Sequence, residues 1–305
     1  MNRPQLAIYG LLALIWGFSF LLLLHVVQAF GWVGAVAIRS FVVSGAVGIA
    51  ALLTRRRLVF KGSWRLVAVL GATTVAGQLV GLSLATPRIG TAMTALLVAT
   101  IPLFSLVIGL VLKVEHVSRT SRIGLALGLV GTVLLVGFPA VPMTPDFLFG
   151  IGCSLAGCFF AAFGSNWARW RMGHVGSWEQ TAGAFLTAGL MTSPLLLVVP
   201  VPGPVNLEAI GYLVALSLIC SALAYTLYFK LVAEVGATLA ISVEFVVPVV
   251  AVIVGALVLG EKLTPPQLLG GAVIIAGCSL VVGLLPPRRG RRTEPEGAPA
   301  LALEG

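Results

Sequence analysis

Long apolar stretches, separated by short polar or Gly/Pro-rich breaks, recur along the chain from Leu6 almost to Pro286. Each stretch approaches the roughly 20 residues that an α-helix needs to cross the hydrocarbon core of a bilayer. Because a backbone inside lipid must satisfy its own hydrogen bonds, these stretches predict membrane-spanning helices. The pattern places ten of them, at 6–28, 32–53, 65–84, 90–112, 121–138, 147–169, 178–199, 209–230, 237–259 and 266–285.

Two further observations favour helices in a membrane over the other fold classes. A β-barrel needs segments of about ten residues that alternate between apolar and polar positions, whereas 96–112 and 245–259 are apolar on every face. The 305 residues are 59% hydrophobic and 10% charged, with a mean hydropathy of +1.08. This composition leaves too little polar surface to cover a soluble protein of that size.

The positions of the basic residues predict the orientation. A net charge of +9 would suggest a nucleic-acid partner in a soluble protein, but here Lys and Arg gather at the ends of the predicted spans. With both termini in the cytoplasm, sixteen of the nineteen Lys and Arg residues fall on the inner side; Arg88 and Lys262 lie outside and Arg39 lies mid-span. We therefore expect a multi-pass protein of the cell inner membrane with no nucleic-acid partner.

An internal repeat appears when the sequence is shifted by 146 positions. Paired residues at this offset include Gly90 and Gly236, Pro102 and Pro248, Gly109 and Gly255, Glu115 and Glu261, Gly124 and Gly270, and Gly131 and Gly277. Each copy holds five spans, and an odd number makes the second copy enter the membrane from the opposite side. The expected fold is therefore all-α, with two inverted five-helix repeats at 1–140 and 147–285 around a central cavity. The Pro-, Gly- and Arg-rich tail, 286–305, is expected to be disordered.

The residues of this repeat resemble a known family, the EamA type of the drug/metabolite transporter (DMT) superfamily. The resemblance rests on Trp16-Gly17-Phe18-Ser19-Phe20 and on the run from Pro248 to Gly260-Glu261-Lys262-Leu263-Thr264, which Gly270 and Gly277 follow. It covers residues 6–285 and implies a ten-helix carrier that exports amino acids or related metabolites. Length and layout are similar to the YddG-like aromatic amino acid exporters. The first copy has Val114-Glu115-His116 where the family usually has Gly-Glu.

Two charged residues lie well inside predicted spans rather than at their ends, Arg39 in the second and Glu244 in the ninth. A central Arg costs about 2.5 to 3.5 kcal/mol on insertion scales, so such a residue needs compensation. Arg39 could hold a substrate carboxylate, and Glu244 could bind an ammonium group or carry a coupled proton. The alternative is that each meets a polar neighbour and serves packing alone.

Uncharged polar and aromatic side chains within spans would suit a cavity that binds a solute weakly and releases it. An aromatic residue deep in a span has no membrane interface to anchor to, which makes it a candidate for substrate contact or for packing. These substrate-binding candidates are Trp16, Phe20, Gln78, Asn166, Trp167, Tyr225 and Tyr228.

The paired Pro and Glu residues of the repeat are candidates for gating. Pro102 and Pro248 remove a backbone hydrogen bond and predict kinks, either static or bending. Glu115 and Glu261 fall at the ends of the fourth and ninth spans, where a carboxylate could hold the next loop, cap the next helix or form a gate contact.

The sequence contains no P-loop, His-Glu-x-x-His motif or nucleophile elbow, and we expect neither catalytic residues, nor a metal, nor a cofactor. A membrane-embedded enzyme and a passive channel are the alternatives to a carrier. The expected partners are the lipid bilayer and a small-molecule substrate. A glycine face such as Gly270 to Gly277 fits packing within a monomer or a homodimer.

Overall fold

The computed structural model describes residues 3–60, 62–111, 119–137, 142–203, 205–235, 240 and 242–282. Within these ranges every regular element is a helix and no strand occurs, which confirms the prediction of an all-helical fold. The predicted tail at 286–305 and Glu115 lie outside the described residues.

The first half of the chain begins with a long helix that is interrupted once. In α1 (Arg3–Leu53), Gly31 has φ 69° and ψ 169°, which separates two helical arms over the predicted spans 6–28 and 32–53. The remaining elements of this half are α2 (Trp64–Leu70), the π-helical η1 (Gly71–Gly77), α3 (Gln78–Ile89), α4 (Thr91–Val98), α5 (Ile101–Val111) and α6 (Arg119–Gly137).

The second half begins with two separate helices, where the first half begins with the single long α1. Its elements are α7 (Pro145–Arg171), α8 (Ser177–Thr192), the 3₁₀ turn η2 (Ser193–Leu197), α9 (Leu207–Ser217), the π-helical η3 (Leu218–Leu223), α10 (Ala224–Val235), the 3₁₀ turn η4 (Ser242–Phe245), α12 (Val247–Val258) and α13 (Pro265–Val282).

Several helices are long and apolar enough to cross a bilayer. In the described part of the chain, five meet both conditions: Arg3–Leu53, Trp64–Ile89, Thr91–Ile108, Pro145–Arg171 and Leu207–Val235. Val247–Val258 and Pro265–Gly277 are shorter apolar helices. Leu52, Leu197 and Leu257 are each at least 78% exposed, which is the surface that a surrounding bilayer would cover.

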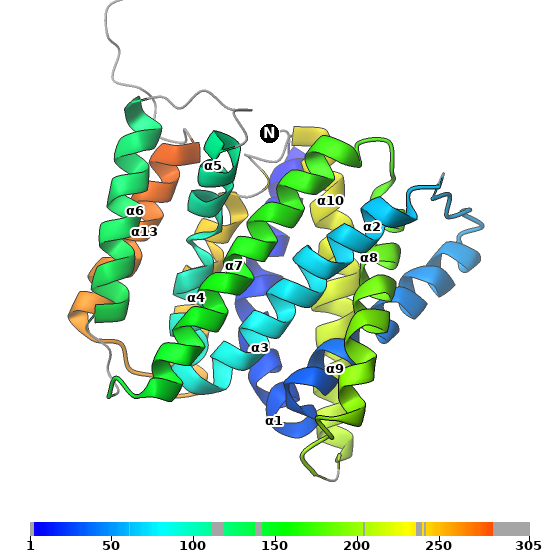
Figure 1. Ribbon diagram of the computed structural model, residues 1–305, viewed down its shortest axis with the longest axis horizontal. Coiled ribbons are helices and arrows are strands. Elements are labelled where there is room, and N and C mark those ends of the chain that lie inside the picture. Colours follow the sequence, from blue (N-terminus) through cyan, green and yellow to red (C-terminus); the bar gives the residue numbers. More distant parts are fainter. Residues whose placement is uncertain are drawn as a thin grey trace, which may run out of the picture.

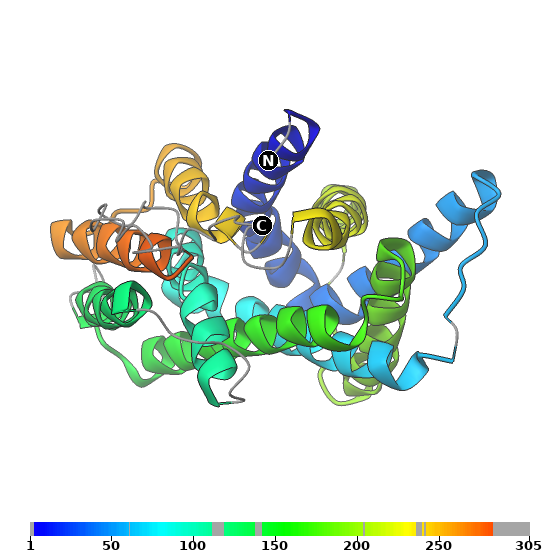
Figure 2. The same ribbon diagram turned by 90° about the horizontal axis from the view of Figure 1, so that it is seen from above.

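Glycines set the packing of α6 against α13, which lie side by side in both views (Figures 1 and 2). A Cβ at Gly131 would lie 2.7 Å from the carbonyl oxygen of Gly270, and one at Gly277 would lie 2.6 Å from that of Gly124. Only a hydrogen at these positions permits so close a backbone approach. The glycine face of α13 therefore packs within the monomer.

Close approaches also position the helices around the centre of the molecule. A Cβ at Gly17 in α1 would overlap the side chain of Val250 in α12. In α3, a Cβ at Gly81 would lie 2.5 Å from the carbonyl oxygen of Cys153 and 2.9 Å from Cα of Gly157 in α7. These contacts draw α1 to α12 and α3 to α7, and the cavity described next lies among these helices.

Candidate functional site

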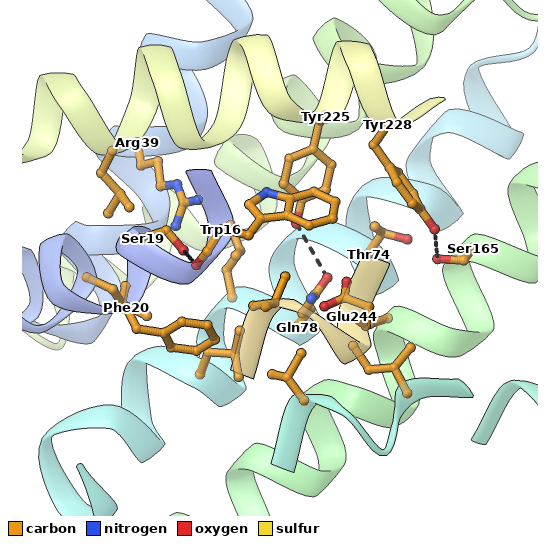
Figure 3. A pocket seen from close by; sticks show the side chains of 18 residues that line it. Trp16, Ser19, Phe20, Arg39, Thr74, Gln78, Ser165, Tyr225, Tyr228 and Glu244 are labelled. Atoms are coloured by element: carbon orange, nitrogen blue, oxygen red, sulfur yellow. Dashed lines mark hydrogen bonds between the residues drawn. The ribbon is translucent and has the colours of Figure 1, made fainter. Parts of the chain in front are cut away.

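A pocket of about 60 Å³ lies where α1, η1, α3, α7 and α10 meet two interrupted helices, one made of α4 and α5 and the other of η4 and α12 (Figure 3). Most of the side chains proposed from the sequence to bind a substrate line it: Trp16, Phe20, Arg39, Gln78, Tyr225, Tyr228 and Glu244. They come from both halves of the chain. Residues separated by up to 228 positions in the sequence thus share one cavity.

Asn166 and Trp167 do not line this pocket. Asn166 is 3% exposed, and its amide Nδ2 donates to Oγ of Ser105 in α5 at 2.8 Å. The indole Nε1 of Trp167 donates to the carbonyl oxygen of Leu66 at 3.1 Å, and its ring stacks on Phe163. Both side chains connect α7 to neighbouring helices, and the structure does not bring them to the other candidates.

Arg39 reaches the pocket from the second arm of α1 and is 5% exposed. Its Nε donates to Oγ of Ser221 in η3 at 2.6 Å, and this hydroxyl donates in turn to the carbonyl oxygen of Leu216 at 2.9 Å. The bond through Nε fixes the plane of the guanidinium. In the part of the chain that the structure describes, the two terminal nitrogens have no acceptor, and their fork geometry suits a carboxylate.

Glu244 enters the pocket from η4, in the interrupted ninth helix, and is half-buried. Within the described ranges the ion pairs are Arg56–Glu179, Arg88–Asp146 and Lys230–Glu234, so neither Arg39 nor Glu244 belongs to one. In Figure 3 the indole of Trp16 lies between the two charged groups. The pocket therefore holds a guanidinium group and a carboxyl group that are not paired with each other.

Aromatic side chains form one wall of the pocket. The ring centroid of Trp16 lies 5.7 Å from that of Tyr225 and 5.3 Å from that of Tyr228. The indole Nε1 of Trp16 donates to the carbonyl oxygen of Cys220 at 3.3 Å, and the Tyr225 hydroxyl donates to Oε1 of Gln78 at 3.4 Å. These bonds hold rigid, amphipathic faces toward the cavity, against which an apolar part of a solute can pack.

The pocket is bordered by two π-helical segments. η1 supplies Thr74 to the pocket and is followed by Gln78 in α3. η3 contributes Ser221, which does not line the pocket itself but binds Arg39, and η3 is followed by Tyr225 in α10. In a π-helix the backbone bonds shift to i+5, and such turns occur frequently at functional sites because they redirect side chains. A shift of 146 residues places η1 on 217–223, almost the range of η3.

The fourth and ninth predicted spans, which contain Pro102 and Pro248, are interrupted rather than kinked. The fourth helix breaks at Ala99–Thr100, between α4 and α5, and the ninth breaks at Val246, between η4 and α12. Pro102 and Pro248 follow as the second residues of α5 and α12. A proline in a first helical turn sacrifices no bond, since the N–H groups there have no intrahelical partner. Val98, Ile101, Glu244 and Val247, which flank the two breaks, all line the pocket.

Glu261 caps a helix, but not the one expected. The sequence suggested the helix that follows it, α13, whereas its carboxylate accepts from the backbone N–H groups of Thr91 and Ala92, at the start of α4. The N-terminus of α13 is capped by Thr264 and Gln267 instead.

The sequence-based candidates missed three polar residues of the pocket, Ser19, Thr74 and Ser165. Thr74 is 2% exposed, and its Oγ1 has no hydrogen-bond partner in the described part of the chain. Ser165 is reached by the Tyr228 hydroxyl at 3.4 Å. Small hydroxyl residues are common in membrane helices, where they bond back to their own turn, so their presence alone gave no signal. Among the described residues no group of three or more His, Cys, Asp or Glu side chains could hold a metal ion.

A bundle of apolar helices with a polar, charged pocket at two helix breaks defines a multi-pass membrane protein with a small-molecule site. Comparison with known families makes the class specific. The profile of the EamA-like transporter family matches residues 6–137 and again 148–283. The chain belongs to the EamA-like transporter family, and it is a multi-pass membrane transporter of the DMT superfamily.

Individual relatives agree with this placement. An uncharacterized protein of Pseudomonas aeruginosa is 28% identical over 272 residues, which cover 86% of each chain. The uncharacterized inner membrane transporter YedA of Escherichia coli K12 is 31% identical over 196 residues, 62% of this chain and 61% of YedA. A solved crystal structure superimposes with a TM-score of 0.68 over 93% of this chain and 98% of its own, at 21% identity, which establishes a shared fold.

Proposed function

We propose that the chain is a secondary transporter that exports small organic metabolites, foremost amino acids, by alternating access. In this proposal ten transmembrane helices form two inverted five-helix halves, 1–140 and 147–285, and both termini lie in the cytoplasm. The substrate binds in the pocket between the halves.

The repeated local structure supports a duplicated architecture. The same family profile matches both halves. The π-helical segments η1 and η3 lie at nearly the offset of the sequence repeat, and so do the helix breaks at Ala99–Thr100 and Val246. Discontinuous helices at the interface of two inverted repeats are the usual location of the substrate site in secondary transporters.

The single observation that carries the substrate class is that a guanidinium group and a carboxyl group share one pocket without pairing with each other. Among the described residues, no side chain bonds the terminal nitrogens of Arg39, and none forms an ion pair with Glu244. Holding both charges inside a membrane protein is costly unless a ligand satisfies them. A zwitterion does so with its carboxylate at Arg39 and its ammonium group at Glu244. The wall of Trp16, Tyr225 and Tyr228 would then receive an apolar or aromatic side chain.

The small volume of the pocket supports a mechanism with moving halves. Ligand pockets usually measure about 300 to 1,000 Å³, whereas this cavity measures about 60 Å³. An amino acid therefore requires the walls to move apart, as expected when the halves rock about a fixed site. Pro102 and Pro248, beside the two helix breaks, are the proposed bending points.

Transport by the purified full-length protein in proteoliposomes tests this function. With an imposed solute or proton gradient, labelled amino acids should enter faster than into protein-free vesicles, and uptake should saturate. A panel of unlabelled metabolites then ranks the substrates by competition. Amino acids would be rejected as the substrate class if no labelled amino acid entered faster than into protein-free vesicles while a labelled monocarboxylate or amine did.

A further inference from the structure

One contact joins the two halves of the chain at an end of the helices that lead from the pocket. Oε1 of Glu261 accepts from the backbone N–H of Thr91 at 2.7 Å, and Oε2 accepts from that of Ala92 at 2.8 Å. Thr91 and Ala92 begin α4, so their N–H groups have no intrahelical acceptor and carry the positive end of the helix dipole. Both oxygens of one carboxylate thus make charge-assisted bonds to the opposite half.

The loop that carries Glu261 does not need this side chain for its own structure. The backbone N–H of Thr264 donates to Oε1 of Gln267 at 2.8 Å, and the N–H of Gln267 donates to Oγ1 of Thr264 at 3.3 Å. This reciprocal pair caps α13. The backbone N–H of Glu261 itself donates to the carbonyl oxygen of Gly255 at 3.1 Å. The carboxylate is therefore available to α4.

Two glycines from opposite halves leave the space that the carboxylate occupies. A Cβ at Gly255 would lie 2.7 Å from Oε2 of Glu261, and one at Gly90 would lie 3.2 Å from Oε1. Gly90 also has φ 82°, a conformation that favours glycine and turns the chain into α4. Larger residues at either position would displace the carboxylate.

The contact lies at the ends of α4 and α12 that are remote from the pocket. Val98 at the end of α4 and Val247 at the start of α12 line the pocket, while Thr91 and the loop after α12 lie at the opposite ends of these helices. All eight residues of α4 are buried, so the helix that Glu261 contacts is packed inside the assembly along its whole length.

We propose that Glu261 is a latch: its bonds to Thr91 and Ala92 hold this end of the pocket shut, and their release opens the pocket to the membrane face on which Glu261 lies. The proposal rests on the proposed transport function, and it specifies which contact controls access to that site. In the topology expected from the basic residues, this is the external face. A carboxylate on backbone amides suits a reversible latch, because water can replace both partners when the ends separate.

Accessibility of the pocket from outside intact cells tests the latch. The reporter is Ser19→Cys in the full-length protein, labelled by a membrane-impermeant maleimide and corrected for labelling without this substitution. E261Q should raise the external labelling rate at least tenfold. E261D has a shorter side chain, which can bond well to only one of the two amides, and it should raise the rate less. The matched control is D146N, which removes another carboxylate, one paired with Arg88 at 2.8 Å, and should leave the rate unchanged.

The variants also separate a latch from a static helix cap. A static cap predicts that E261Q and E261D lower the melting temperature while Ser19→Cys is labelled as in D146N, and that result overturns the proposal. If E261Q does not fold, E261D alone decides: labelling no faster than in D146N overturns the latch. Labelling requires no substrate. Faster labelling in a protein that transports no amino acid would therefore uphold the latch and reject the proposed substrate class.

Discussion

Replacing Arg39 by Gln should weaken binding of amino acids without unfolding the protein. Arg39 holds Ser221 through Nε at 2.6 Å, and its terminal nitrogens remain to bind a carboxylate. A hydrogen bond to a charged group contributes about 1.5 to 3 kcal/mol. At about 1.4 kcal/mol per factor of ten, its loss should raise the apparent dissociation constant roughly ten- to a hundredfold.

The stability of the R39Q variant should not fall with its affinity. A central Arg costs about 2.5 to 3.5 kcal/mol on insertion scales, so its removal relieves a cost. Ser221 loses a donor but keeps its bond to the carbonyl oxygen of Leu216 at 2.9 Å. The melting temperature of R39Q in detergent should therefore equal or exceed that of the unsubstituted protein. A packing role for Arg39 predicts the opposite, a lower melting temperature with unchanged affinity for the substrate.

A cycle between protein and ligand isolates the interaction itself. Competition against labelled substrate is measured for an amino acid and for its methyl ester, which lacks the carboxylate charge. The unsubstituted protein should prefer the amino acid by roughly ten- to a hundredfold, and R39Q should show almost no preference. An equal loss of affinity for both ligands in R39Q would refute a direct bond between Arg39 and the carboxylate.

Three further substitutions test other parts of the structure. E244Q should abolish the preference for an amino acid over its des-amino analogue, measured by the same competition assay; an unchanged preference would place the ammonium group elsewhere. G81A inserts a methyl group 2.5 Å from a carbonyl oxygen of α7 and should destabilise the protein by about 1 to 3 kcal/mol in thermal unfolding. Its control, G152A, adds a methyl group that meets no neighbouring atom within 4 Å and should not destabilise the protein. Equal melting temperatures of G81A and G152A would contradict the close α3–α7 packing. N166A removes the bond to Ser105 and should lower stability by about 1 kcal/mol while leaving KM unchanged; a raised KM would return Asn166 to the substrate site.

The helical class could be predicted from the sequence because apolar length constrains a membrane helix strongly. The interruptions within helices could not be located in the same way. Pro102 and Pro248 indicated where a backbone hydrogen bond of the helix is missing. A kink and a full break lack the same hydrogen bond, so the sequence does not distinguish them. The structure resolves them as breaks at Ala99–Thr100 and Val246 because each proline sits in the first turn of a new helix. The π-helical η1 and η3 have no residue signature of their own.

Pocket residues could be predicted from the sequence where their side chains are energetically costly to place in lipid. Arg39 and Glu244 stood out because a charge inside a span needs a polar environment, and both line the pocket. Asn166 was predicted as a substrate-binding residue from its depth in a span, but depth along a helix does not determine the face of the helix on which a residue lies. Its neighbour Ser165, about 100° further round α7, lines the pocket, while Asn166 turns toward α5.

The partner of Glu261 illustrates what sequence distance hides. Local reasoning favours the next helix, since a carboxylate just before a helix commonly caps it. Here Thr264 and Gln267 already cap α13, and Glu261 bonds instead to α4, 170 residues away in sequence. Only the three-dimensional arrangement of the two halves brings that helix end within reach.

Counterflow in proteoliposomes tests most directly whether this pocket serves a carrier of zwitterions. Vesicles are loaded with a high concentration of an unlabelled amino acid and diluted into buffer that holds only a trace of the labelled one, with no imposed ion gradient, and entry of the label is followed. The unsubstituted protein should show a transient accumulation of label that R39Q lacks, because an alternating site returns loaded with substrate. Label that only equilibrates, at the same rate in loaded and empty vesicles, would contradict alternating access through this site.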